Sequence, residues 1–133
     1  MKSIVMRAFA GALAAAAVML SAMTARAHHS FDAEYDSTRV LTLTGVVTQL
    51  DWINPHAYVF LDVKDADGTV RNYKVEMGPP YALVRGGWKR DTIKIGDKVT
   101  ISNAAQAKDG SSGAGSMPTT SMTLENGQKL VMR

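Results

Sequence analysis

The sequence predicts an all-β protein: a small OB-like barrel of about five to six strands with one short helix, preceded by a signal-peptide helix. The first reason is that apolar and polar residues alternate with a period of two through most of the chain after residue 40, as in strands with one buried face. The second is the order of the elements, in which a long strand and a hairpin precede a short helix and further strands. A short β-sandwich is the alternative.

The first strand is expected over residues 40–52, and its inward face changes midway. Leu43 lies on one face, whereas Val46 and Leu50 lie on the other. Gly45 stands at the change, and a glycine there allows a strand to bulge or coil so that it serves two sheets in turn.

The next elements form a hairpin. Asn54-Pro55 ends the first strand, because proline cannot donate to a strand ladder. Strands follow over residues 57–64 and 70–77, and Asp65–Gly68 supplies the turn between them.

The second half of the domain begins with one or two helical turns over residues 81–85, between a proline pair and Gly86-Gly87. A turn and a strand are expected over 93–101, and a mobile glycine-rich loop over 104–116. The last strands, 117–124 and 129–132, flank the hairpin signal Asn126-Gly127.

The N-terminus resembles an export signal. Lys2 and Arg7 precede the apolar run Ala8–Ala22, and Ala25-Arg26-Ala27 is a small-x-small cleavage site. The 15-residue run is short for a membrane span, which needs about 20 residues, and a second arginine does not follow Arg7. We therefore expect a cleavable signal peptide over 1–27, an N-terminal arm over 28–39 and the barrel over 40–133. The general secretory route would then deliver the protein to the periplasm.

Composition excludes several classes of function. The leader contains Lys2, Arg7 and Arg26, which leaves 12 of the 15 basic residues to balance 12 acidic ones. A neutral domain is a poor ligand for a polyphosphate, so no nucleic-acid partner is expected, and no membrane association is expected after cleavage. The absence of cysteine excludes disulfides, thiolate metal sites and a cysteine nucleophile.

Six short motifs resemble an exported bacterial family, domain-of-unknown-function family 6152, whose members are small periplasmic OB-like proteins. The His-His-Ser-Phe start and the Asn-Pro-His turn are the specific ones, whereas Gly-Asp-x-Val is common in small barrels. The resemblance implies a secreted OB-like domain and implies no activity. The motifs are Ala27–Phe31, Leu43–Val47, Trp52–His56, Arg85–Trp88, Gly96–Val99 and Lys108–Gly110.

The three histidines suggest a metal site. Cleavage after Ala27 makes His28 the N-terminal residue, whose α-amino group and imidazole form a two-nitrogen chelate. A further nitrogen from His29 or His56 gives a nitrogen-rich site, which suits Cu(II) best among common divalent metals. If the arm doubled back along the first strand as an edge strand, its tip would lie near His56. The alternative is a frayed terminus, with His56 bonded to its own turn.

Aromatic residues indicate a second possible site. Tyr58 and Phe60 face away from the predicted core, on the strands that commonly bind ligands in OB barrels. Arg85 and Trp88 after the helix are candidates for the same ligand or partner surface. The alternative readings are that the arm or the helix covers the aromatics, that Trp88 belongs to the core, and that Arg85 is merely solvated.

No motif for catalysis is recognisable, so we expect no enzyme. The preferred interpretation is a non-enzymatic periplasmic binding module, with copper as its possible cofactor. An accessory protein that docks on a larger exported enzyme through the aromatic face is the alternative, and an undiscovered hydrolase is the third class.

Overall fold

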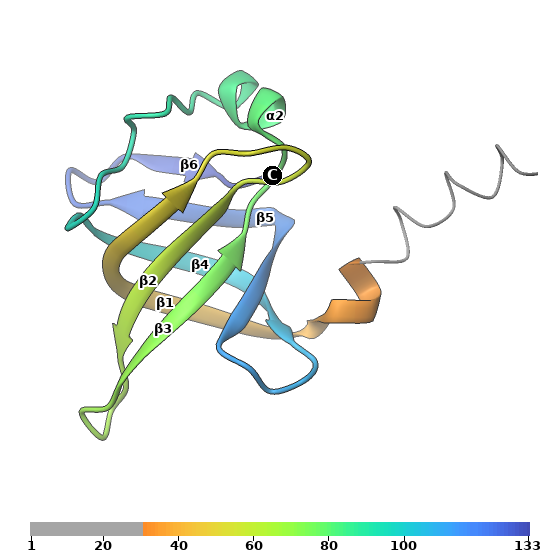
Figure 1. The fold of residues 1–133 in the computed structure, drawn as a ribbon, viewed down its shortest axis with the longest axis vertical. Helices are drawn as coiled ribbons and strands as arrows, with labels where there is room; N and C mark the ends of the chain where they lie inside the picture. Colours follow the sequence, from red (N-terminus) through yellow and green to blue (C-terminus); the bar gives the residue numbers. More distant parts are fainter. Residues whose placement is uncertain (1–30) are drawn as a thin grey trace, which may run out of the picture. The chain divides into compact units, whose positions relative to one another are not determined.

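Six strands and a short helix form the described part of the chain, residues 31–133, in the computed structural model (Figure 1). Residues 34–133 form one compact unit. Four helical residues, 31–34, precede the first strand. The elements are β1 (Tyr35–Asp51), β2 (Tyr58–Lys64), β3 (Val70–Glu76), α2 (Pro80–Arg85), β4 (Lys98–Ala107), β5 (Gly113–Leu124) and β6 (Lys129–Val131).

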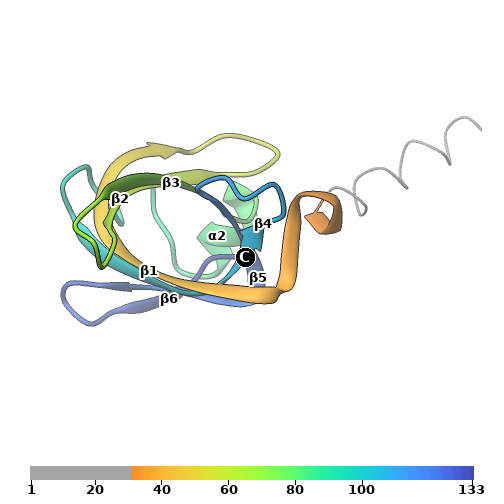
Figure 2. The same ribbon diagram turned by 90° about the horizontal axis from the view of Figure 1, so that it is seen from below.

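The sheet closes on itself. Its order is β3-β2-β1-β4-β5-β6, and β3 also pairs with β5 in parallel, so β1 to β5 form a ring that is visible end-on in Figure 2. The helix connects β3 to β4. This is the arrangement of an OB barrel, which confirms the predicted fold and excludes the sandwich.

The long first strand serves two neighbours, as predicted, although its change of face lies elsewhere. Its first part pairs with β4 and its second with β2, and Gly45 has a partner in both. A Cβ at Gly45 would lie 2.5 Å from the carbonyl oxygen of Asp62, so only glycine fits. Val46 is 41% exposed, because the inward face changes at the bulge between Val47 and Gln49 and not at Gly45.

The expectation that the N-terminal arm forms an edge strand folded back along β1 is wrong for its described residues. Residues 31–34 are helical, and β1 begins at Tyr35 instead of Val40. Tyr35 pairs with Ala107, because β4 is long enough to offer backbone partners to the start of β1. Residues 35–39 therefore extend the first strand.

The expected mobile loop over 104–116 is also wrong. Its two ends belong to β4 and β5, so the connection spans only residues 108–112. Ala104, Ala105 and Ala114 are fully buried. A Cβ at Gly113 would lie 3.2 Å from that of Ala107, so the small residues here allow the closing strands to approach each other.

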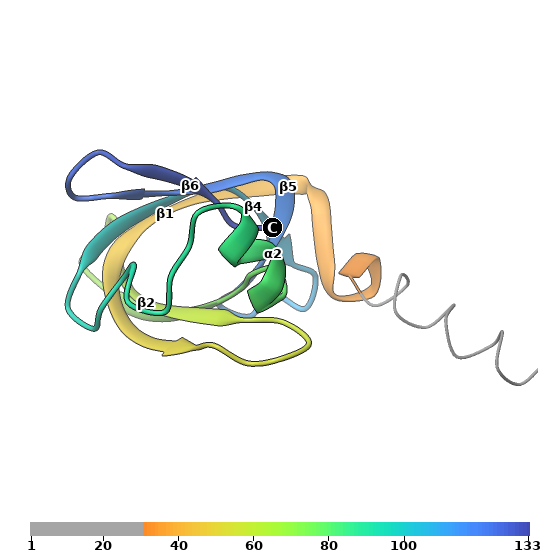
Figure 3. The same ribbon diagram turned by 90° about the horizontal axis from the view of Figure 1, so that it is seen from above.

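Turns and the helix agree well with expectation. Gly68 and Gly127 take φ values of +87° and +85° in the two predicted hairpins. The helix begins with Pro80, ends at the cap residue Gly86 and lies across one end of the barrel (Figure 3). In the described part of the chain, no helix has the length and apolarity to cross a membrane.

The core fills the barrel and extends under α2. Leu83 and Trp88 belong to it together with inward residues of all five barrel strands. Trp88 is 1% exposed, and its indole Nε1 donates to the carbonyl oxygen of Val131 at 2.7 Å. The segment after the helix is thereby attached to β6.

Candidate functional site

Glu76 lies at the centre of a cluster of polar side chains on the outer surface of the barrel. The residues before and after it, Val75 and Met77, point into the core, so strand alternation turns Glu76 outward. Tyr58 is its partner on β2 and Gly115 its partner on β5.

His56 is oriented by this carboxylate. It follows the cis peptide bond Asn54–Pro55 in the loop between β1 and β2. Its Nδ1 lies 2.6 Å from Oε1 of Glu76, and the two side chains are 36% and 14% exposed. With the proton on Nδ1 directed at the carboxylate, the lone pair of Nε2 remains for a ligand or a proton. No hydrogen bond of Nε2 occurs among the described residues.

Tyr35 forms a hydrogen bond with the other oxygen of the same carboxylate. Its hydroxyl donates to Oε2 of Glu76 at 3.0 Å, and the residue is 9% exposed. Burial, and then the charge of Glu76, raises the pKa of the Tyr35 phenol well above its usual range. The backbone is held as well, since the Ser116 hydroxyl donates to the carbonyl oxygen of Glu76. Glu76 thus joins the start of β1 to the β1–β2 loop.

The predicted aromatic face lies next to this cluster. Tyr58 and Phe60 are half-buried and point outward from β2. The Lys74 ammonium lies 4.2 Å from the centroid of the Tyr58 ring and so occupies one face of it. Burial, followed by the charges of Glu76 and Glu34, raises the pKa of Tyr58. A ligand that stacks on Tyr58 would have to use the other ring face.

The remaining predicted site residues do not join this cluster. His28 and His29 lie outside the described residues. Arg85 is exposed at the end of α2, with its guanidinium 5.7 Å from the Tyr81 ring centroid. Trp88 is a core residue, as the alternative reading had it, and so does not contribute to an exposed surface.

Sequence reasoning missed the acceptor on which the cluster depends. Alternation in the third strand already indicates that Glu76 points outward, and the predicted hairpin indicates that the residues just before β2 lie near it, but nothing local indicates that Tyr35 meets them. The β2–β3 hairpin, in which Tyr58 pairs with Glu76, brings His56 to the carboxylate across 20 residues, whereas closure of the barrel brings Tyr35 to it across 41. Within residues 31–133, no three His, Cys, Asp or Glu side chains group as a metal site.

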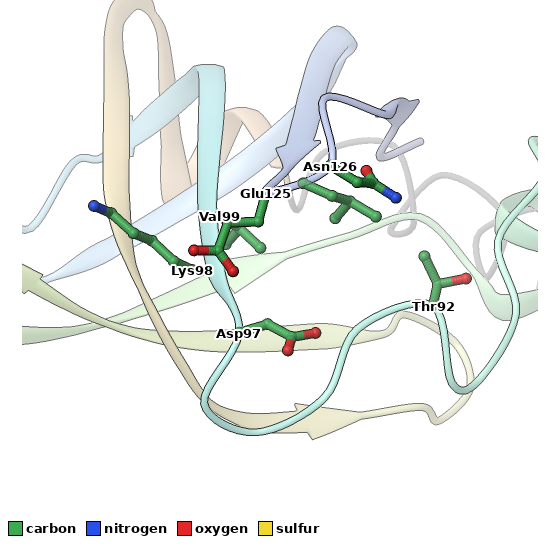
Figure 4. A pocket seen from close by; sticks show the side chains of 7 residues that line it. Thr92, Asp97, Lys98, Val99, Glu125 and Asn126 are labelled. Atoms are coloured by element: carbon green, nitrogen blue, oxygen red, sulfur yellow. The ribbon is translucent and has the colours of Figure 1, made fainter.

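A separate groove lies between the start of β4 and the β5–β6 turn (Figure 4). Its volume of about 190 Å³ is below the usual range of small-molecule sites, and none of the predicted site residues lines it. The lining residues are Thr92, Asp97, Lys98, Val99, Leu124, Glu125 and Asn126.

Comparison with known proteins gives one match. The model of a family of unknown function, DUF6152, matches residues 15–116. No curated protein and no solved structure matches the chain.

Proposed function

Since the chain belongs to the DUF6152 family, to which no function is assigned, we propose from its own geometry that it is a non-enzymatic binding module for Cu(II). The proposal includes export to the periplasm and removal of residues 1–27. The ligands are Nε2 of His56 and the nitrogens of His28 and His29.

The observation that carries the proposal is the bond between His56 and Glu76. Histidines that bind metals almost always donate their second ring nitrogen to a carboxylate, a carbonyl or water. Such a partner fixes the tautomer and the ring orientation and makes the coordinating nitrogen more basic. The 2.6 Å contact between Nδ1 and Glu76 meets this requirement, and Nε2 is the nitrogen left for the metal.

The length of the chain allows the histidines near the N-terminus to reach His56. Tyr35 bonds to the same carboxylate as His56. His28 precedes Tyr35 by seven positions, and because residues 31–34 are helical this stretch spans up to about 17 Å. The bond from Tyr35 to Glu76 supports the proposal, because it fixes the start of β1 beside the partner of His56.

The chemistry of the ligand set favours copper. An N-terminal histidine would offer two nitrogen ligands, its α-amino group and its imidazole. The α-amino group titrates at about pH 8. With His56 these make three nitrogen ligands, and nitrogen ligands bind Cu(II) most strongly among the common divalent metals.

The test is a copper titration of the purified protein by calorimetry, after its mass has fixed the N-terminal residue. We expect His56→Ala to weaken copper binding at least tenfold, and one extra residue before His28 to do the same. Gln128→Ala, at an exposed turn, is the matched control and should bind as the unaltered protein does. Equal affinity of the His56→Ala variant and the control would overturn the proposal.

A second candidate is an accessory protein that docks on a larger exported protein. It is favoured by the half-buried, outward-facing pair Tyr58 and Phe60, because aromatic residues are enriched at the centres of protein interfaces. Co-purification of a partner that is lost on Phe60→Ser, with no copper-dependent rise in melting temperature, would support this candidate over the first.

A further inference from the structure

The most outward-facing apolar side chains of the helix region lie beside a group of cations. Tyr81 and Val84 are 65% and 57% exposed and lie three residues apart on α2, on one side of the helix. Arg85, Lys89 and Arg90 follow within the next six residues and are exposed as well. We call these five residues the α2 surface.

Core residues hold in place the segment that carries the α2 surface. Leu83 and Trp88 are each 1% exposed and belong to the core, so they fix the segment from below. Gly87 turns the chain after the helix with a φ of +95°, and Trp88 bonds to the backbone of β6. The exposed side chains therefore belong to a rigid element. Figure 3 shows that α2 lies at one end of the barrel.

The α2 surface carries a net positive charge. Its three basic residues outnumber the nearest acidic residues along the chain, which are Asp91 directly after Arg90 and Glu76 before the helix. None of the three cations makes an ion pair with an acidic side chain in the described part of the chain. The Arg85 guanidinium lies against the Tyr81 ring instead.

From this arrangement we propose that the α2 surface docks on an anionic lipid bilayer. Tyrosine is favoured at the membrane interface because its ring is apolar and its hydroxyl polar, and basic side chains beside it meet lipid phosphates. Two exposed apolar residues are too few for a stable protein interface, which needs about 800 Å² on each side. A membrane contact is different, since its strength grows with each inserted apolar group and each cation.

This proposal does not depend on copper binding, and it revises the expectation that the cleaved protein makes no membrane contact. That expectation considered segments long enough to span the membrane. A peripheral contact needs no such segment.

The test is co-sedimentation of the purified protein with vesicles of phosphatidylcholine alone and of phosphatidylcholine mixed with phosphatidylglycerol. We expect binding only to the anionic vesicles, with weakening as salt rises. The triple variant R85Q/K89Q/R90Q should lose about fivefold in affinity per cation, or about a hundredfold in all. The double variant Y81S/V84S should weaken vesicle binding by a smaller factor than the triple variant does.

Two matched variants serve as controls. K64Q/K98Q/K129Q removes the same charge from exposed sites elsewhere, and V40S/V70S removes side chains that are 53% and 58% exposed outside α2. All variants are compared in the same N-terminal form, so the leader cannot account for a difference. Equal losses in the controls, binding to neutral vesicles, or no vesicle binding would overturn the proposal. Loss of an acidic protein partner in the triple variant without vesicle binding would do so as well.

Discussion

Replacement of Glu76 by glutamine tests the centre of the candidate site. The carboxylate accepts two hydrogen bonds, from Nδ1 of His56 at 2.6 Å and from the Tyr35 hydroxyl at 3.0 Å. Glutamine keeps the shape but removes the charge, and it offers one acceptor where two are needed. Tyr35 must then rotate its hydroxyl to accept a bond from the new amide.

The expected loss of stability follows from removal of the negative charge that strengthens both hydrogen bonds. Hydrogen bonds to charged groups contribute about 1.5–3 kcal/mol and neutral ones about 0.5–1.5 kcal/mol. The bond to Tyr35 should thus lose about 1 kcal/mol. The bond to His56 loses less, because that ring is 36% exposed and solvent screens the interaction. The expected cost is therefore about 1–2 kcal/mol of unfolding free energy.

The assay is urea unfolding at neutral pH, together with spectroscopic titration of the tyrosines. Glu76→Gln should also lower the pKa of Tyr35, since the negative charge of Glu76 is one cause of its rise. Glu125→Gln, which alters an exposed carboxylate on the β5–β6 turn, is the control and should change neither quantity. A Glu76→Gln variant as stable as this control, with Tyr35 unchanged, would refute the role assigned to Glu76.

Three further predictions concern the barrel. Gly45→Ala should destabilise the protein by about 2–3 kcal/mol in urea unfolding, because its Cβ would lie 2.5 Å from the Asp62 carbonyl oxygen; a cost below about 0.5 kcal/mol would contradict this. Trp88→Phe should cost about 2 kcal/mol by the same measurement, since it removes the bond to Val131 and leaves a small cavity; a neutral result would show that the indole N–H contributes nothing. Tyr35 has its pKa raised in the folded state, so its contribution to stability is complete below about pH 10 and is lost as pH rises; Tyr35→Phe should flatten this alkaline fall in melting temperature, and an unchanged fall would assign it to other groups.

Local patterns were enough to predict the fold class. The hairpin turns at Gly68 and Gly127, the proline-led helix and the long first strand each depend on a few neighbouring residues, and all of them form. One of the predictions that failed rested on composition. The run from 104 to 116 is rich in small residues, which is typical of a mobile loop, but here small residues are needed where β4 and β5 close the barrel.

The candidate site was predictable only in part. His56 is visible as one of three histidines, and Tyr58 and Phe60 follow from strand alternation. Glu76 is brought to them by the β2–β3 hairpin, but Tyr35 comes from the start of β1, and only the closed ring places it beside Glu76. A period-two pattern states which face a residue takes, but it does not state which strands are neighbours.

Closure of the barrel also divides the copper proposal into two separable parts. The bonds that orient His56 lie within the unit formed by residues 34–133, so they exist whatever the N-terminal segment does. A protein with a blocked N-terminus should therefore keep an oriented His56 and its stability, and lose only copper affinity. Glu76→Gln with a free N-terminus should keep the chelate of His28 and weaken the bond to the third nitrogen. If the two changes reduced copper affinity by factors that multiply in the combined variant, the N-terminus and the His56–Glu76 pair would contribute independently to binding.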